Sequence, residues 1–238
     1  MWKCIISLIG TMAWVSVTFG QTDSSDLRPP KPPKVKKQAK EFIPTGVMVG
    51  VDLFVIGRSI WEEELSQQEY QVEVDSRQYH LTIGYGIQDI TRLTETTLYT
   101  NEGSYWRVNA EVNFLYNSGN RSKLFFGVGY GRATFDDIFV YETQDAFGNT
   151  QIIDQNRDAN ASWMELTAGT KVRVWKELYM GYTIRYKFLK DYQAGSLIPH
   201  DLPGYGPNRE DDKDIFGFNY YLYWRFPFRK PTRLSAIN

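Results

Sequence analysis

The segment 215–228, "IFGFNYYLYWRFPF", alternates between two kinds of side chain at every second position. One parity is apolar throughout: Phe216, Phe218, Tyr220, Leu222, Trp224, Phe226 and Phe228. The other parity is mixed and includes Gly217, Asn219 and Arg225. A period of two predicts a β-strand whose two faces meet different environments. Seven consecutive apolar positions on one face are more than a sheet facing water needs.

The same alternation recurs along the chain and predicts eight strands. They cover residues 46–58, 69–76, 79–90, 104–116, 123–140, 160–175, 177–190 and 215–228. Short connections (76–78, 117–122, 175–177) alternate with long polar loops (59–68, 91–103, 141–159, 191–213). An antiparallel meander would place the tight turns at one end, the turn rim, and the long loops at the other, the loop rim. Bacterial outer-membrane barrels are built on this plan.

Side-chain size predicts which face points inward. The mixed parity carries Gly50, Gly84, Gly86, Gly127, Gly129, Gly131, Gly169, Gly181 and Gly217. The interior of an eight-stranded barrel is just wide enough for side chains, so we expect glycines and charges inside and rings outside. A lipocalin-like soluble barrel is the alternative, but outward rings would expose more apolar surface than soluble monomers tolerate. The predicted fold is therefore an all-β, eight-stranded, antiparallel up-and-down transmembrane β-barrel.

The two parities assign residues to lipid and to lumen. Expected lipid-facing residues are Trp106, Val108, Val112, Phe114, Leu166, Val172, Ile184, Phe218, Leu222 and Trp224. Charged residues of the opposite parity are Asp52, Glu73, Arg107, Glu111, Glu165, Lys171, Arg173, Arg185, Lys187 and Arg225. Enclosed charges must be paired, so we interpret them as a structural network that fills the barrel. A translocation path is the alternative, although eight strands leave no wide channel.

The N-terminal region predicts export. Lys3, an apolar run and the small residues Thr18 and Gly20 indicate a signal peptide over 1–20, with a membrane-anchoring helix as the alternative. Residues 21–43 form a Pro/Lys-rich linker, either a simple tether or a segment that meets an anionic surface. The barrel would span 44–230 and a short tail 231–238, with both the linker and the C-terminus in the periplasm. No apolar run of spanning length follows residue 20, so a membrane crossing would require a closed barrel.

The sequence offers little chemistry. The two histidines are His80, expected to be solvated at the turn rim, and His200, beside Asp201 in the longest loop. The acidic run 209–214, "REDDKD", lacks the ligand spacing and glycine of an EF-hand loop. We therefore expect no catalytic residue, no cofactor and no metal site. A net charge of −1 gives no indication of nucleic-acid binding.

Five segments carry a family resemblance. In order they are "SYWRVNAEVNFLYN", "LFFGVGYGRATF", "ELYMGYTIRYKFL", "PGYGPN" and "FGFNYYLYWRFPF". They resemble an uncharacterised family of Bacteroidetes outer-membrane β-barrel proteins with OmpA/OmpX-like architecture, over about residues 42–230. The resemblance implies fold and location but no reaction. Phe226 and Phe228 are similar to the terminal aromatic signal of such barrels, except that "RKPTRLSAIN" follows.

The expected function is a structural or interaction role at the cell envelope, without enzymatic activity. The expected partners are outer-membrane lipid and an unidentified periplasmic or cell-surface component. A lipid-modifying enzyme and a small-solute pore are the alternatives.

Overall fold

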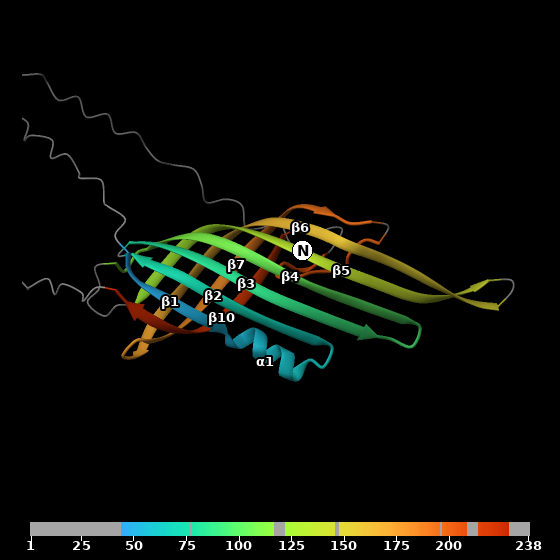
Figure 1. Cartoon of the computed structure of the whole chain (residues 1–238), viewed down its shortest axis with the longest axis horizontal. Helices are drawn as coiled ribbons and strands as arrows, with labels where there is room; N and C mark the ends of the chain where they lie inside the picture. Colours follow the sequence, from blue (N-terminus) through green and yellow to red (C-terminus); the bar gives the residue numbers. More distant parts are fainter. Residues whose placement is uncertain are drawn as a thin grey trace, which may run out of the picture. The chain divides into compact units, whose positions relative to one another are not determined.

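Eight long antiparallel strands close into a barrel in the order β1-β10-β7-β6-β5-β4-β3-β2 (Figure 1). The computed structural model describes residues 44–76, 78–116, 122–145, 148–195, 197–208 and 214–228. The strands are β1 (Pro44–Asp52), β2 (Leu65–Ser76), β3 (Tyr79–Leu93), β4 (Thr97–Asn113), β5 (Lys123–Asp145), β6 (Gly148–Trp175), β7 (Leu178–Gln193) and β10 (Asp214–Pro227). The predicted eight-stranded up-and-down barrel is confirmed. The expected signal, linker and tail (1–20, 21–43 and 231–238) lie outside the described residues.

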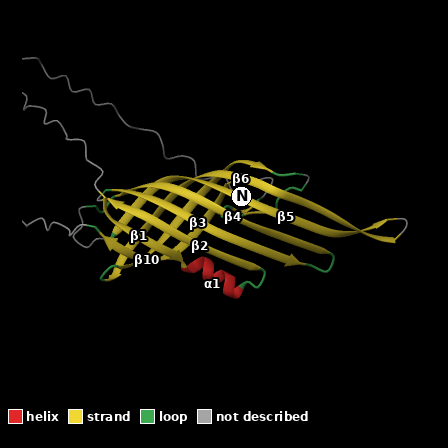
Figure 2. Ribbon diagram, viewed as in Figure 1, coloured by secondary structure: helices red, strands yellow, loops and turns green. Residues whose placement is uncertain are grey.

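The first strand is shorter than predicted because helix α1 (Leu53–Trp61) follows it (Figure 2). The predicted strand to residue 58 was therefore wrong. Asp52 ends β1 and caps the helix: its carboxylate accepts the backbone N–H groups of Phe54 (2.9 Å) and Val55 (3.3 Å). Within the described ranges, no helix has both the length and the hydropathy needed to cross a membrane.

Two of the predicted loops are strands. The β3–β4 hairpin extends to Leu93 and Thr97, and the β5–β6 hairpin to Asp145 and Gly148 (Figure 1). These extensions were missed because they lack the apolar/polar alternation. Two short strands, β8 (Asp201–Leu202) and β9 (Gly206–Pro207), lie within the predicted loop 191–213.

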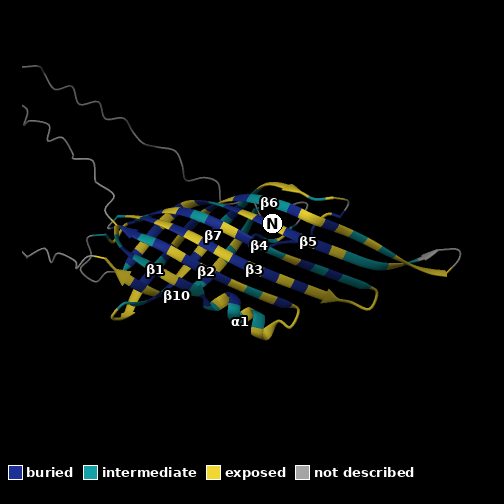
Figure 3. Ribbon diagram, viewed as in Figure 1, coloured by how far each residue is buried: buried dark blue, intermediate teal, exposed yellow. Residues whose placement is uncertain are grey.

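Burial alternates along the strands, as Figure 3 shows. In β3 the outward Leu81, Ile83, Tyr85 and Ile87 are 41–53% exposed, whereas the inward residues between them are buried. All ten residues expected to face lipid lie on the outer surface, half-buried or exposed.

The lumen contains rings as well as charges, so the expectation that rings point only outward was wrong. Inward rings lie opposite glycines on neighbouring strands, in the pairs Tyr223–Gly50, Tyr105–Gly86, Trp163–Gly131 and Phe125–Gly169. A Cβ atom on Gly131 would overlap the ring of Trp163, which is fully buried. The glycines therefore provide the space that the inward rings fill.

Gly131→Ala tests this packing. Since the new methyl group would force the buried Trp163 ring to move, we expect a loss of about 1–3 kcal/mol in the free energy of unfolding. Urea unfolding in lipid vesicles measures it. Gly57→Ala is the matched control: Gly57 lies in α1 with no described atom within 4 Å of an added Cβ, so stability should hold or rise. Equal effects of the two substitutions would contradict tight packing at Gly131.

Candidate functional site

A cluster of buried ion pairs fills the lumen toward the turn rim. The Lys123 ammonium lies 2.6 Å from Glu73 Oε1 and 3.1 Å from Asp75 Oδ1. Lys171 donates to Glu73 and lies 3.3 Å from Glu111 Oε2. These five side chains come from four strands, so they link the barrel wall across the lumen.

Two more side chains complete this cluster. The Arg225 Nε donates to Asp75 Oδ2 at 3.1 Å. His80, only 3% exposed, places Nδ1 3.0 Å from Asp75 Oδ1 and 3.3 Å from Glu73 Oε1, so its expected solvation was wrong. Ligand atoms of Glu73, Asp75 and His80 lie within 4.8 Å of one another, close enough to hold a metal ion. The Lys123 ammonium already provides a cation to both carboxylates, which argues against a metal here.

A second cluster lies further toward the loop rim. Glu69 accepts hydrogen bonds from Tyr105 (2.7 Å), Arg107 (2.9 Å) and Tyr221 (2.5 Å). Arg185 pairs with Glu165 at 2.5 Å between Nη1 and Oε1. All of these side chains are almost fully buried. The three donors on Glu69 occupy most of its acceptor capacity.

The structure places nine of the ten predicted network residues inside the barrel: Asp52, Glu73, Arg107, Glu111, Glu165, Lys171, Arg185, Lys187 and Arg225. Arg173 is exposed, so its assignment to the network was wrong. The β6–β7 register shifts between Arg173 and Trp175, where β6 runs out beyond the lumen. The prediction missed Glu69, Asp75, His80 and Lys123, and the first two could have been found because they share the parity of Glu73.

The chain 197–208, which we call the loop plug, is packed against the inner wall at the loop rim. Leu202 and Tyr205 are buried and pack with Tyr105 and Trp163. Lys187 Nζ donates to the backbone carbonyls of Gly204 (2.7 Å) and Tyr205 (2.9 Å). Gly204 has φ +72°, and an added Cβ would overlap Tyr105. Only glycine fits there, which explains its place in "PGYGPN".

Side chains of the β3–β4 hairpin contact the loop plug. Arg92 pairs with Asp201 at 2.6 Å, and Asn101 Nδ2 donates to the Asp201 carbonyl at 3.1 Å. The Asp201 N–H donates to the Tyr99 hydroxyl at 3.2 Å. Burial raises the pKa of Tyr99 to about 12, so this hydroxyl stays protonated at neutral pH. The exposed His200 stacks on Phe139 with ring centroids 5.4 Å apart, a packing role. Most of the acidic run 209–214 lies outside the described residues.

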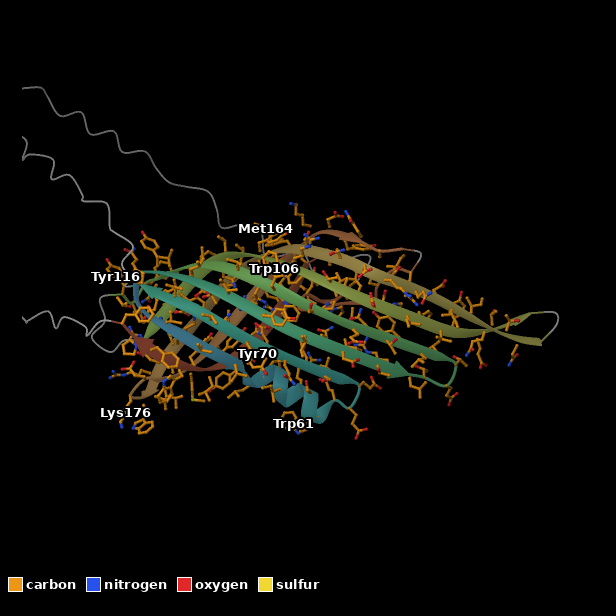
Figure 4. The ribbon with its side chains drawn as sticks, viewed as in Figure 1. Trp61, Tyr70, Trp106, Tyr116, Met164 and Lys176 are labelled. Atoms are coloured by element: carbon orange, nitrogen blue, oxygen red, sulfur yellow. The ribbon has the colours of Figure 1, made fainter. Side chains whose placement is uncertain are left out.

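A cavity of about 790 Å³ lies beside the plug, lined by α1 and the loop-rim parts of β2 and β10. Because β1 ends at Asp52, no strand lies between β2 and β10 beside the cavity. In the described residues, the pairing of β10 with β1 begins at Tyr221. Figure 4 shows Trp61 at the outer end of α1, where it is 86% exposed. This cavity is the candidate binding site.

Comparison with known proteins identifies a family and two structures of low similarity. The family described as "Domain of unknown function (DUF6048)" matches residues 1–231. No curated protein matches the chain. The crystal structure of Acinetobacter baumannii CarO2 is similar with 13% identity and a TM-score of 0.41, covering 78% of this chain and 100% of that one. Acinetobacter baumannii CarO has 13% identity and a TM-score of 0.40, with coverage of 78% and 98%.

Proposed function

The chain belongs to the DUF6048 family, whose description names no activity, and we propose that it is an outer-membrane barrel with a structural or interaction role at the cell envelope. The observation that carries this proposal is the apolar belt on the outside of the barrel. The belt comprises the outward residues of 47–51, 70–74, 79–87, 106–112, 124–130, 164–174, 178–188 and 216–226.

The belt has the composition of a lipid-facing surface. It covers 9–11 residues on four strands (79–87, 164–174, 178–188 and 216–226), the length that a tilted strand needs to cross a bilayer, and 5–7 residues on the other four. Tyr70, Trp106 and Tyr130 lie at its margin toward the loop rim, where membrane barrels carry aromatic girdles. Figure 4 labels the first two. A continuous exposed belt of this size would make a soluble monomer prone to association.

The interior favours binding over conduction or catalysis. Ion pairs fill the lumen toward the turn rim, and the loop plug packs at the opposite rim. His80 is held by buried acids and His200 by rings, an arrangement that supports no catalytic role for either. We therefore propose interaction with outer-membrane lipid and with a periplasmic or cell-surface component.

Finer parts of the proposal rest on sequence alone. They are the cleaved signal over 1–20, the periplasmic location of the linker and C-terminus, the OmpA/OmpX-like architecture and the Bacteroidetes origin.

Electrical recording tests the sealed lumen. Purified protein in a planar bilayer should give no stepwise current, because Lys171 and Arg185 are held in buried ion pairs that block the axis. A general porin in the same bilayer is the positive control. Reproducible current steps that change in size with Lys171→Gln would overturn the proposal and favour a pore.

A further inference from the structure

We propose that the cavity beside α1 binds an amphiphile with an anionic head and one acyl chain, which enters from the lipid side of the barrel. A long-chain fatty acid is the simplest such ligand. This inference deepens the proposed function and rests on its membrane placement.

The barrel wall is interrupted at the level of the cavity. Within the described ranges, β10 from Asp214 to Tyr220 pairs only with β7, and β2 from Leu65 to Glu69 only with β3. The Tyr220 N–H points toward the missing strand and donates to Asp52 Oδ1 at 3.2 Å. Since the backbone N–H and C=O groups of a strand alternate in direction, those of Phe218 and Phe216 also point toward the gap between β10 and β2. Helix α1 therefore takes the place of the rest of β1.

Helix α1 is held more firmly on one side of the gap than on the other. On the β2 side, Ser59 Oγ accepts the Gln67 N–H at 2.7 Å. On the β10 side, Phe54 meets Phe218 edge to face, with ring centroids 5.3 Å apart. Two packed rings can move apart without breaking a hydrogen bond. Two paired strands cannot, because backbone hydrogen bonds join them. We call the contact between Phe54 and Phe218, with Phe216 next along β10, the side portal.

The cavity behind the side portal changes from apolar to basic with depth. Its volume of about 790 Å³ lies within the range of small-molecule sites. Phe54, Val55 and Phe218 line it on the α1–β10 side, and the buried Arg107 and Lys187 line it from the inner wall together with Glu69. An acyl chain fits the outer part, and an anionic head the inner part.

Arg107 has hydrogen-bonding capacity to spare. Its Nη2 donates to Glu69 and to the Gly204 carbonyl (3.5 Å), whereas Nε and Nη1 are enclosed by the protein without a hydrogen-bond partner among the described atoms, Nη1 lying 4.0 Å from Glu165 Oε2. Lys187 donates to carbonyls, and none of the described carboxylates forms an ion pair with it. A buried donor without an acceptor is unfavourable, and an anionic oxygen is its strongest partner.

Basic side chains line the cavity next to Arg107. Glu69 and Glu165 pair with the guanidinium groups of Arg107 and Arg185, and Lys187 Nζ, which donates to backbone carbonyls, adds a third basic group. The nearby Asp52 carboxylate is already surrounded by N–H donors from Phe54, Val55, Asn219 and Tyr220.

The acids at the loop rim favour entry from the side. Glu62, Glu63 and Glu64 follow α1 and line the cavity toward the loop rim. Of these, Glu62 pairs with Arg58 at 2.7 Å. An anion approaching from water would meet this acidic rim, whereas one embedded in lipid meets the rings of the side portal.

Photolabelling tests the site. The full-length protein in phosphatidylcholine nanodiscs is exposed to a photoreactive palmitate analogue, and labelled peptides are identified by mass spectrometry. Labels should concentrate on α1 and on β10 near Phe218. Gly217→Leu should reduce labelling about tenfold, the effect of roughly 1.4 kcal/mol of lost binding. An added Cβ there lies 3.0 Å from Lys187 Cε and Nζ, so the new side chain fills the cavity. Gly57→Leu adds the same side chain in open space and should leave labelling unchanged.

Two further comparisons separate the parts of the proposal. Arg107→Gln should also lose labelling, and a photoreactive alcohol of the same chain length should label weakly because it lacks the charge. Equal labelling by acid and alcohol would overturn the anionic head site. Equal labelling of the Gly217→Leu and Gly57→Leu proteins would overturn the cavity assignment.

The outcome also distinguishes this inference from the proposed function. Insertion is verified by heat-modifiable gel mobility. A barrel that inserts but does not label contradicts the binding site and leaves the membrane location standing. A chain that does not enter nanodiscs contradicts both.

Discussion

Arg185→Met should destabilise the barrel by about 3–5 kcal/mol, the usual cost of removing one partner from a buried ion pair. Arg185 is fully buried, pairs with Glu165 at 2.5 Å and donates to Asn219 Oδ1 at 2.8 Å. Without it, the contacts left to the Glu165 carboxylate among the described side chains are Trp163 Nε1 at 3.3 Å and Arg107 Nη1 at 4.0 Å. Urea unfolding in lipid vesicles, followed by gel mobility, gives the free energy.

Two variants establish that the loss comes from an unpaired charge. Arg58→Met breaks the Arg58–Glu62 pair, whose side chains are 43% and 48% exposed, and should cost less than about 1 kcal/mol. Arg185→Met combined with Glu165→Leu should recover much of the loss, because replacing both partners of a buried pair by apolar residues is often neutral. If Arg185→Met costs no more than Arg58→Met, the lumen pairs do not stabilise the barrel.

Ala110→Arg should cost about 2–4 kcal/mol if the belt lies in a bilayer, since arginine at the midplane of a membrane barrel carries that penalty. Ala110 is exposed and lies on the outward face of β4 within the belt, between Val108 and Val112. Folding into vesicles measures the cost.

Thr100→Arg is the matched control for the belt. Thr100 faces outward on the same strand, in the hairpin beyond the belt, so the same substitution should cost about 0–1 kcal/mol. Costs below about 1 kcal/mol at both positions would mean that the outward face of β4 does not meet lipid.

Period-two alternation predicted the barrel because the strands within the belt separate two environments. It failed where that separation ends. In the β5–β6 hairpin beyond the belt both faces are largely polar, so pairing continues without a recognisable pattern. After Asp52 the alternation of Leu53 and Val55 persists by chance, and the capping carboxylate was the signal for a helix.

The candidate site was less predictable than the fold. Parity brought Arg107 and Lys187 to the lumen but says nothing about which hydrogen bonds they make. The loop plug has no period at all, because its position depends on single contacts such as Lys187 with Gly204. The cavity arises from the early end of β1 combined with the packing of α1, and neither is visible in the residues that line it.

The short closing seam has a consequence for how the molecule is made. In the part of the chain that the structure describes, strand β1 pairs with β10 from Gly46 to Asp52, opposite Pro227 to Tyr221, and these partners lie about 170 to 180 residues apart in the sequence. Six of the other neighbouring pairs join strands that follow one another in sequence and can form as local hairpins, and the seventh, β7 with β10, is separated only by the segment that holds β8 and β9. Closure must therefore wait for the final strand to be synthesised and delivered. A chain that lacks β10 would remain an open sheet, so closure of the seam depends on that strand.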